Sequence, residues 1–144
     1  MPRPPSPAEA TPSSLWLQCA AIAFVLSVLG LSVVATVGGR RFLSALVNVI
    51  PGEDLTAHAV LYGCAAFLCG AAFGDPAQPR RTWRNAGWVG VLSVVEESTQ
   101  LLIPGRTFSG GDLLANGVGI GLGTLLAIRL HSRTRKPGAP AKLG

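Results

Sequence analysis

Four stretches of mostly apolar residues, separated by polar connections, divide the chain. They cover residues 15–37, 57–74, 86–103 and 113–130. Each is close to the roughly 17–25 residues that a helix needs to cross a bilayer. The first contains no charged residue, whereas the second includes His58 and the third includes Glu96 and Glu97. The pattern predicts an all-α protein, an antiparallel four-helix bundle that spans a membrane.

The first connection contains a shorter amphipathic segment over residues 40–50. Leu43, Leu46, Val47 and Ile50 recur there at helical spacing, with polar residues on the opposite face. Such a segment is too short to cross a bilayer and is typical of a helix lying in the interface. Pro51 and Gly52 then end it. We therefore expect a short interfacial helix in this connection.

Composition supports a small integral membrane protein. Of the 144 residues, 49% are hydrophobic and 13% are charged, against about 25% charged in soluble proteins. Residues 1–14 hold five prolines and residues 131–144 are basic, so both are expected to be disordered tails flanking one helical domain over residues 15–130. A cleavable signal peptide is an alternative for the first stretch, but that stretch exceeds the usual 7–15 apolar residues.

The distribution of Lys and Arg predicts the orientation. Nine lie in the two tails, in the second connection and at the end of the last stretch (Arg129), and three lie on the other side, in the first and third connections. The positive-inside rule then places both termini in the cytoplasm. The net charge of +5 is explained by this topology and by anionic lipid, so no nucleic-acid partner is indicated.

The three cysteines predict neither a disulfide nor a zinc site. Cys19, Cys64 and Cys69 lie inside apolar stretches, are odd in number and have no Cys-x-x-Cys spacing. We interpret them as small buried hydrophobic residues.

Polar residues gather where the predicted topology brings helix ends to the outer side of the membrane. An ionisable group within a spanning helix costs on the order of 2.5 to 3.5 kcal/mol at the helix centre, so its presence indicates function by default. Asp54, His58 and Tyr62 share one helical stripe, spaced four residues apart. The full candidate set is Asp54, His58, Tyr62, Glu97, Gln100, Arg106, Ser109, Asp112 and Asn116.

Within this set, His58 is the candidate general acid or base, and Glu97 or Asp112 is expected to orient it. Arg106 is the candidate for binding an anionic group. Six residues, Arg106 among them, are candidates for binding a substrate. They are Asp54, Tyr62, Gln100, Arg106, Ser109 and Asn116. Glu96 points about 100° away from Glu97 on a helix, where it would face a different neighbour or bond a helix partner as a neutral acid, and Glu97 is preferred to it as a site residue.

Structural roles are alternatives for several of these residues. Asp54 suits a helix N-terminus, and Ser109 precedes Asp112 by three residues, as in a capping box.

Glycines at 117, 119, 121 and 123 form overlapping Gly-x-x-x-Gly pairs in the last stretch. They predict close helix packing, with a homodimer through this helix as one outcome.

The same residues carry a resemblance to a known family. The spacing Asp54-x-x-x-His58-x-x-x-Tyr62, followed by the ordered set from Glu97 to Gly119, resembles the VanZ-like family of small bacterial membrane proteins over residues 53–123. One departure is Leu55, where the family commonly has Lys, which removes a second outer cation beside Arg106. The resemblance implies a role in the cell envelope, because the family's named member is associated with teicoplanin resistance.

Three classes of function remain open at this stage. The first is a site for a lipid head group or a lipid-linked cell-wall precursor, with or without catalysis. The second is a small transporter or a proton or ion relay, and the third is a structural network between helices. A divalent cation held by His58, Glu97 and Asp112 is a lesser alternative to a site without a cofactor.

Overall fold

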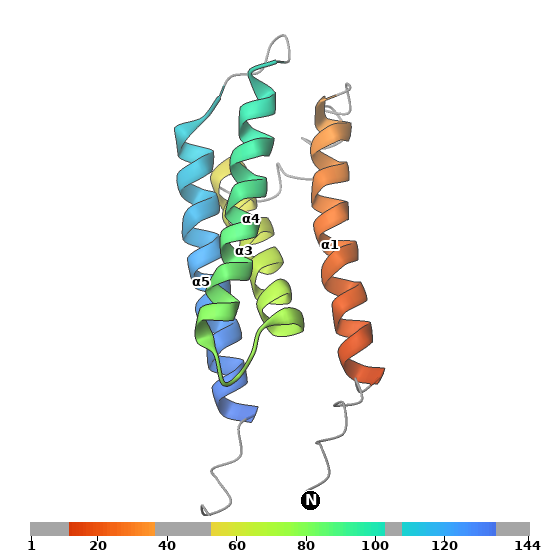
Figure 1. Cartoon of the computed structure of the whole chain (residues 1–144). Coiled ribbons are helices and arrows are strands. Elements are labelled where there is room, and N and C mark those ends of the chain that lie inside the picture. Colours follow the sequence, from red (N-terminus) through yellow and green to blue (C-terminus); the bar gives the residue numbers. More distant parts are fainter. Residues whose placement is uncertain (1–11, 37–52, 103–107, 135–144) are drawn as a thin grey trace, which may run out of the picture.

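A computed structural model describes residues 12–36, 53–102 and 108–134 of the chain. The regular structure of this part is entirely helical. Figure 1 shows the helices side by side and alternating in direction, so that the start of the first and the end of the last lie at the same end of the bundle. The expected all-α, antiparallel bundle is therefore observed in the described residues. Its helices are α1 (Pro12–Thr36), α3 (Glu53–Phe73), α4 (Pro79–Gln100) and α5 (Gly110–Thr134).

Three of these helices are long and apolar enough to cross a membrane. The qualifying stretches are Leu15–Val34 in α1, Leu55–Phe73 in α3 and Gly110–Arg133 in α5. Among the described helices, α4 does not reach the same hydropathy, because it carries Arg80, Arg81 and Arg84 near its start and two glutamates near its end. That α4 is a fourth span stays a prediction.

The helices extend beyond the apolar stretches that predict them. Helix α4 begins at Pro79, seven residues before the expected residue 86, because proline is favoured in the first turn, where its missing N–H is not needed. Helix α1 begins at Pro12 and α5 continues to Thr134, within the segments assigned to the tails. The expected interfacial helix over residues 40–50 lies outside the described residues.

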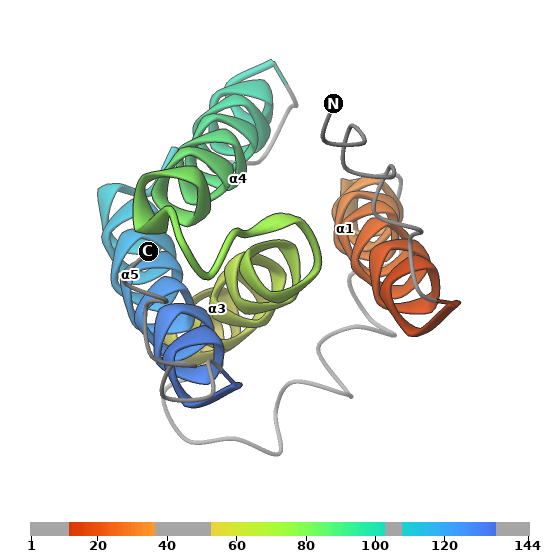
Figure 2. The ribbon, with the colours of Figure 1, turned by 60° about the horizontal axis from the view of Figure 1, so that its bottom comes forward.

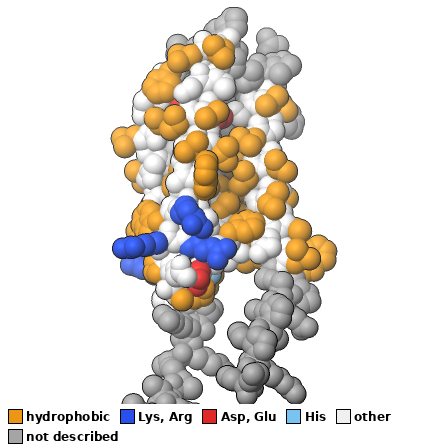
Figure 3. All heavy atoms as spheres, in the orientation of Figure 1, with side chains coloured by type: hydrophobic (Ala, Val, Ile, Leu, Met, Phe, Trp, Pro, Cys, Tyr) orange, Lys and Arg blue, Asp and Glu red, His pale blue; other side chains and the backbone are white. Residues whose placement is uncertain are grey.

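Helix α4 turns its polar side toward the other helices. Its buried positions recur every three or four residues, at Thr82, Ala86, Val89, Ser93, Glu97 and Gln100. Large apolar side chains such as Trp88, Val91 and Val95 are exposed on its outer side. Figure 3 shows hydrophobic side chains over much of the visible surface, with Lys and Arg gathered toward one end. An apolar exterior around a polar interior fits a bundle surrounded by lipid.

Glycines allow α3 and α5 to approach closely. A Cβ atom at Gly119 would lie 2.0 Å from the Ala59 carbonyl oxygen, and one at Gly123 would lie 2.1 Å from the Gly63 carbonyl oxygen. By contrast, added Cβ atoms at Gly117 and Gly121 would meet nothing within 4 Å. The predicted close packing of the glycine-rich helix is thus confirmed, and its partner inside the chain is α3.

Helix α1 is the least embedded member of the bundle. Figure 2 shows it to one side of the group formed by α3, α4 and α5. It packs mainly on α3, where Phe24, Val25 and Val28 contact the small core around Tyr62 and Val89. Most of its large apolar side chains are exposed, among them Trp16, which is 77% exposed. A single face of α1 therefore joins it to the rest of the bundle.

The interpretation of all three cysteines as buried is wrong. Cys19 and Cys64 are exposed and Cys69 is half-buried, and all three are free thiols. The apolar stretches in which they lie form outer faces of α1 and α3 as well as inner ones, so hydropathy alone does not place a residue inside the bundle.

Substitutions at the glycines test the close contact of α3 with α5. We expect Gly119→Ala and Gly123→Ala each to destabilise the protein by about 1–3 kcal/mol, because the added methyl group would force the two backbones apart. Gly121→Ala is the matched control, since a methyl group there meets open space, and it is expected to be neutral or stabilising. Thermal unfolding in detergent measures the difference, and equal stability of all three variants would contradict the packing described.

Candidate functional site

Side chains from all four described helices gather near one end of the bundle in two hydrogen-bonded groups, which the contact between His58 and Asp112 joins into one set. This end holds the C-terminal turns of α1 and α4 and the N-terminal turns of α3 and α5. We call the set the polar network. Its members are Ser32, His58, Tyr62, Ser93, Glu96, Glu97, Gln100, Ser109, Asp112 and Asn116.

Glu97 is the most enclosed member of the network. Its side chain is fully buried on the inner face of α4. One carboxylate oxygen accepts the backbone N–H of Ser109 at 2.7 Å, and the other accepts the Gln100 side-chain amide at 3.1 Å. Because both oxygens have partners, burial of this carboxyl group is compensated. Glu97 thereby holds the start of α5 against the end of α4.

Glu96 is the junction of the network with α1 and α3. Its carboxylate accepts hydrogen bonds from the Ser32 hydroxyl at 2.5 Å and from the Tyr62 hydroxyl at 3.0 Å. The Gln100 amide also donates to it, at 3.2 Å, and so bridges the two neighbouring carboxyl groups. Glu96 therefore connects residues of three helices, although it was left outside the predicted site.

His58 lies between two residues of α5. Its Nδ1 atom is 3.1 Å from the Asn116 side-chain oxygen, and its Nε2 atom is 3.8 Å from a carboxylate oxygen of Asp112. Asn116 is fully buried and donates its amide to the Ser93 hydroxyl at 2.8 Å. The side chains of His58 and Asp112 keep 23% and 19% of their surface accessible. This pair is therefore a part of the network that a ligand can reach.

Ser109 performs the capping role that its spacing predicts. Its hydroxyl oxygen accepts the backbone N–H of Asp112 at 3.1 Å, as expected for the residue before the first turn of a helix. Its backbone N–H is meanwhile bound by Glu97. Ser109 thus joins the Glu97 part of the network to the Asp112 part through its own backbone.

The structure brings together seven of the nine predicted site residues. His58, Tyr62, Glu97, Gln100, Ser109, Asp112 and Asn116 all belong to the polar network. Asp54 lies in the first turn of α3, where its contacts are not described, and Arg106 lies outside the described residues. Of the two carboxylates expected to orient His58, Asp112 is the one beside it, while Glu97 binds Gln100 and Ser109.

Sequence reasoning did not include Ser32 or Glu96 in the site. A signal for Ser32 was present, because it is a polar position near the relevant end of an otherwise apolar stretch. Glu96 was set aside since it points away from Glu97. The missing fact was that α1 packs against the side of α4 to which Glu96 points.

No metal site emerges in the parts of the chain that the structure covers, where no group of three or more His, Cys, Asp or Glu side chains is arranged to hold an ion. His58 and Asp112 alone supply two ligands, and a zinc site ordinarily takes three or four from the protein. Of the three ligands in the lesser alternative of a divalent cation, His58 and Asp112 lie together, whereas Glu97 binds Gln100 and Ser109.

Comparison with protein-family models, with curated proteins and with solved structures finds no significant match to this chain.

Removal of the Glu97 carboxylate tests how far the network stabilises the bundle. We expect Glu97→Ala to lower the free energy of unfolding by about 1–3 kcal/mol, because the buried donors of Ser109 and Gln100 lose an acceptor. Glu97→Gln keeps one acceptor oxygen and is expected to lose less. The control is Ser98→Ala on the exposed side of α4, which should stay within about 0.5 kcal/mol of the wild type. Unfolding in detergent, followed by circular dichroism, provides the measurement, and a stable Glu97→Ala protein would contradict the assigned role.

Proposed function

We propose that this chain is a multi-pass membrane protein that binds the polar head group of a lipid or lipid-linked cell-wall precursor at the polar network. The observation that carries the proposal is the accessible His58–Asp112 pair, held by fully buried groups behind it. A rigid polar wall with one exposed acid–imidazole pair suits recognition of hydroxyl, amide and ammonium groups. The apolar exterior of the bundle supplies the setting in which such a molecule would approach.

In the proposed topology, α4 is the fourth span, both termini are cytoplasmic, and the polar network faces outward from a bacterial plasma membrane. The excess of Lys and Arg on the tails and the second connection supports this orientation. The five charges of α4 are compatible with a span, because its glutamates have partners inside the bundle and its arginines lie in the first six residues of the helix. Arginine side chains so near a helix end can extend to the membrane interface.

The ordered spacing that resembles the VanZ-like family supports an envelope role for the same residues. Those of its polar members from His58 to Asn116 that the structure describes fall in one network, which fits a common purpose for the pattern. We extend the proposal accordingly to tolerance of teicoplanin, with Arg106 as the outer anion-binding residue.

A structural network is the second candidate, and one observation favours it. Both oxygens of Glu97 and both oxygens of Glu96 already accept hydrogen bonds within the chain. Interhelical hydrogen bonds average only about 0.6 kcal/mol in one measured membrane protein. The accessible surface of His58 and Asp112 is what a purely structural network would not need, and we therefore favour binding.

Lipids that copurify with the protein test the binding proposal. We expect the wild type, washed in mild detergent, to retain one head-group class several-fold enriched over the total membrane lipid. Asp112→Asn and His58→Ala should lose this enrichment because they alter the exposed pair. Asp75→Asn, at the opposite end of the bundle, is the control and should keep it. Lipid mass spectrometry makes the comparison, and bulk lipid composition on the wild type would overturn the proposal.

Drug susceptibility tests the envelope role separately. We expect a sensitive bacterium that expresses the wild type to tolerate more teicoplanin than the vector control, and Arg106→Ala to remove the gain by deleting the outer cation. Immunoblots must show equal membrane levels of the two proteins. No gain from the wild type would remove teicoplanin tolerance from the proposal and leave the lipid measurement to decide on binding.

A further inference from the structure

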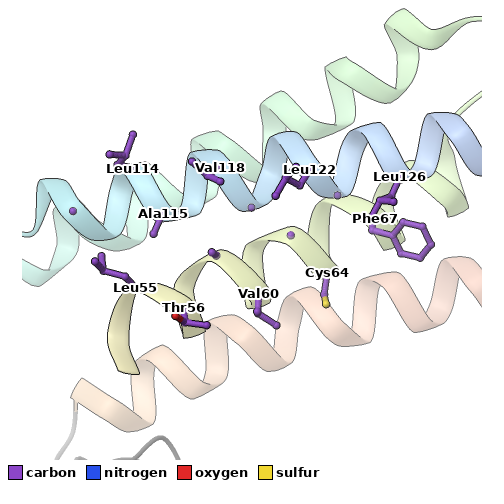
Figure 4. A pocket seen from close by; sticks show the side chains of 15 residues that line it. Leu55, Thr56, Val60, Cys64, Phe67, Leu114, Ala115, Val118, Leu122 and Leu126 are labelled. Atoms are coloured by element: carbon purple, nitrogen blue, oxygen red, sulfur yellow. The ribbon is translucent and has the colours of Figure 1, made fainter. Parts of the chain in front are cut away.

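A long apolar groove runs along the outer side of the α3–α5 pair. Its walls are formed by side chains such as Leu55, Val60 and Phe67 of α3 and Leu114, Val118 and Leu122 of α5 (Figure 4). Its volume is about 730 Å³, within the roughly 300–1,000 Å³ typical of ligand sites. No described residue of α1 or α4 lines it, so the groove opens away from both helices.

The close approach of the two helices creates this groove. Gly63, Gly119 and Gly123 line it, and their lack of side chains lets the backbones of α3 and α5 touch at its base. The longer side chains stand on either side, and Figure 4 shows them along both helices. The result is an open groove with apolar walls, rather than a flat surface.

The groove has the length of one lipid leaflet. From Leu55 to Phe67 it follows twelve residue steps of α3, or about 18 Å at 1.5 Å per residue. Half of the hydrocarbon core of a bilayer is about 15 Å. An extended acyl chain of one leaflet would therefore fit the groove along its length.

One end of the groove lies beside the accessible part of the polar network. On α3 its first residues are Leu55 and Thr56, which directly precede the turn that carries His58. On α5 its first residue is Gly111, the neighbour of Asp112. A Cβ atom at Gly111 would be 3.4 Å from Leu55 and 3.5 Å from the Ser109 hydroxyl, so groove and network meet there. The groove and the polar network thus meet at the start of α5, where an amphiphile could place its apolar part in the groove and its polar part at the network.

From this continuity we infer that the groove holds one acyl chain of the lipid whose head group the polar network binds. The inference rests on the proposed function and adds the class of ligand, a lipid with an extended acyl chain rather than a free head group.

The experiment uses lipid that the cell makes itself, so that no head group has to be chosen. Cells expressing the full chain are fed a diazirine-bearing palmitic acid, which they build into their membrane lipids. The protein is purified with extensive detergent washing to remove loosely bound lipid, then irradiated, and labelled peptides are mapped by mass spectrometry. We expect label on groove residues such as Val60 and Val118, at least fivefold above label on Val91 and Val95, which are exposed on α4.

A variant with a larger side chain in the groove tests whether the label depends on open space there, and the same change outside the groove is its control. Ala115 lines the groove, and we expect Ala115→Leu to reduce groove labelling at least fivefold by occupying the space. Ala23→Leu adds the same side chain on the exposed side of α1 and should leave labelling unchanged. Equal label on the groove and on α4 in the wild type would overturn the inference without relying on any variant.

Two other occupants of the groove, a second copy of the chain and the segment of residues 40–50, can be distinguished by disulfide formation. In a Cys19→Ser, Cys69→Ser background, oxidation can act on Cys64, which lines the groove and is exposed. A disulfide-linked dimer would assign the groove to a second copy of the chain. With Leu46→Cys added, an intramolecular disulfide would assign it to the segment of residues 40–50. Either disulfide, together with absent groove label, would overturn the inference.

The outcomes separate this inference from the proposed function. If the head-group enrichment of the wild type survives in Ala115→Leu and no groove label forms, the acyl-chain site is wrong and head-group binding stands. If groove label forms and is unchanged in Asp112→Asn, the chain site stands and the role of the polar network is wrong.

Discussion

The close contact between α3 and α5 determines the arrangement of everything else that the structure describes. It depends on the absence of side chains at Gly119 and Gly123, which leaves room for the backbone of α3. Ordinary helix pairs keep their axes about 8–10 Å apart because side chains separate them. On the inner side, the contact lets His58 reach Asn116 and Asp112 across the interface. On the outer side, the same contact leaves the groove between the two rows of longer side chains.

Near its end, helix α4 completes the interior with two carboxyl groups that have partners from α1, α3 and the start of α5. Glu96 faces α1 and α3, whereas Glu97 faces the start of α5. In a low-dielectric interior an unpaired polar group is costly, and a satisfied network fixes one arrangement of the helices. The accessible edge at His58 and Asp112 therefore sits on a support that leaves these side chains little freedom to change partners.

Hydropathy and spacing predicted the four helices, the packing of the glycine-rich helix and most residues of the polar network. These features follow from local periodicity, since residues at positions i and i+4 share a helix face wherever that helix packs. The contribution of Ser32 and Glu96 could not be predicted in this way, because it depends on which side of α4 is covered by α1. One partner of Glu97 is the backbone N–H of Ser109. The sequence does not indicate which backbone group will donate a hydrogen bond to a given side chain. Hydropathy also failed to predict the start of α4 at Pro79, because three arginines lower the mean hydropathy of its first two turns.

The different neighbours that the two glutamates contact have a consequence for how the chain assembles during synthesis. Ser32 and Tyr62 precede α4 in the chain, so the partners of Glu96 have already left the ribosome when α4 emerges. Ser109 follows α4, so its contact with Glu97 forms only after the next connection has been made. In the proposed membrane setting, α4 would dock on α1 and α3 through Glu96 as it leaves the translocon. The contact of Glu97 with Ser109 would form afterwards, when α5 has been made, and would fix α5 in place.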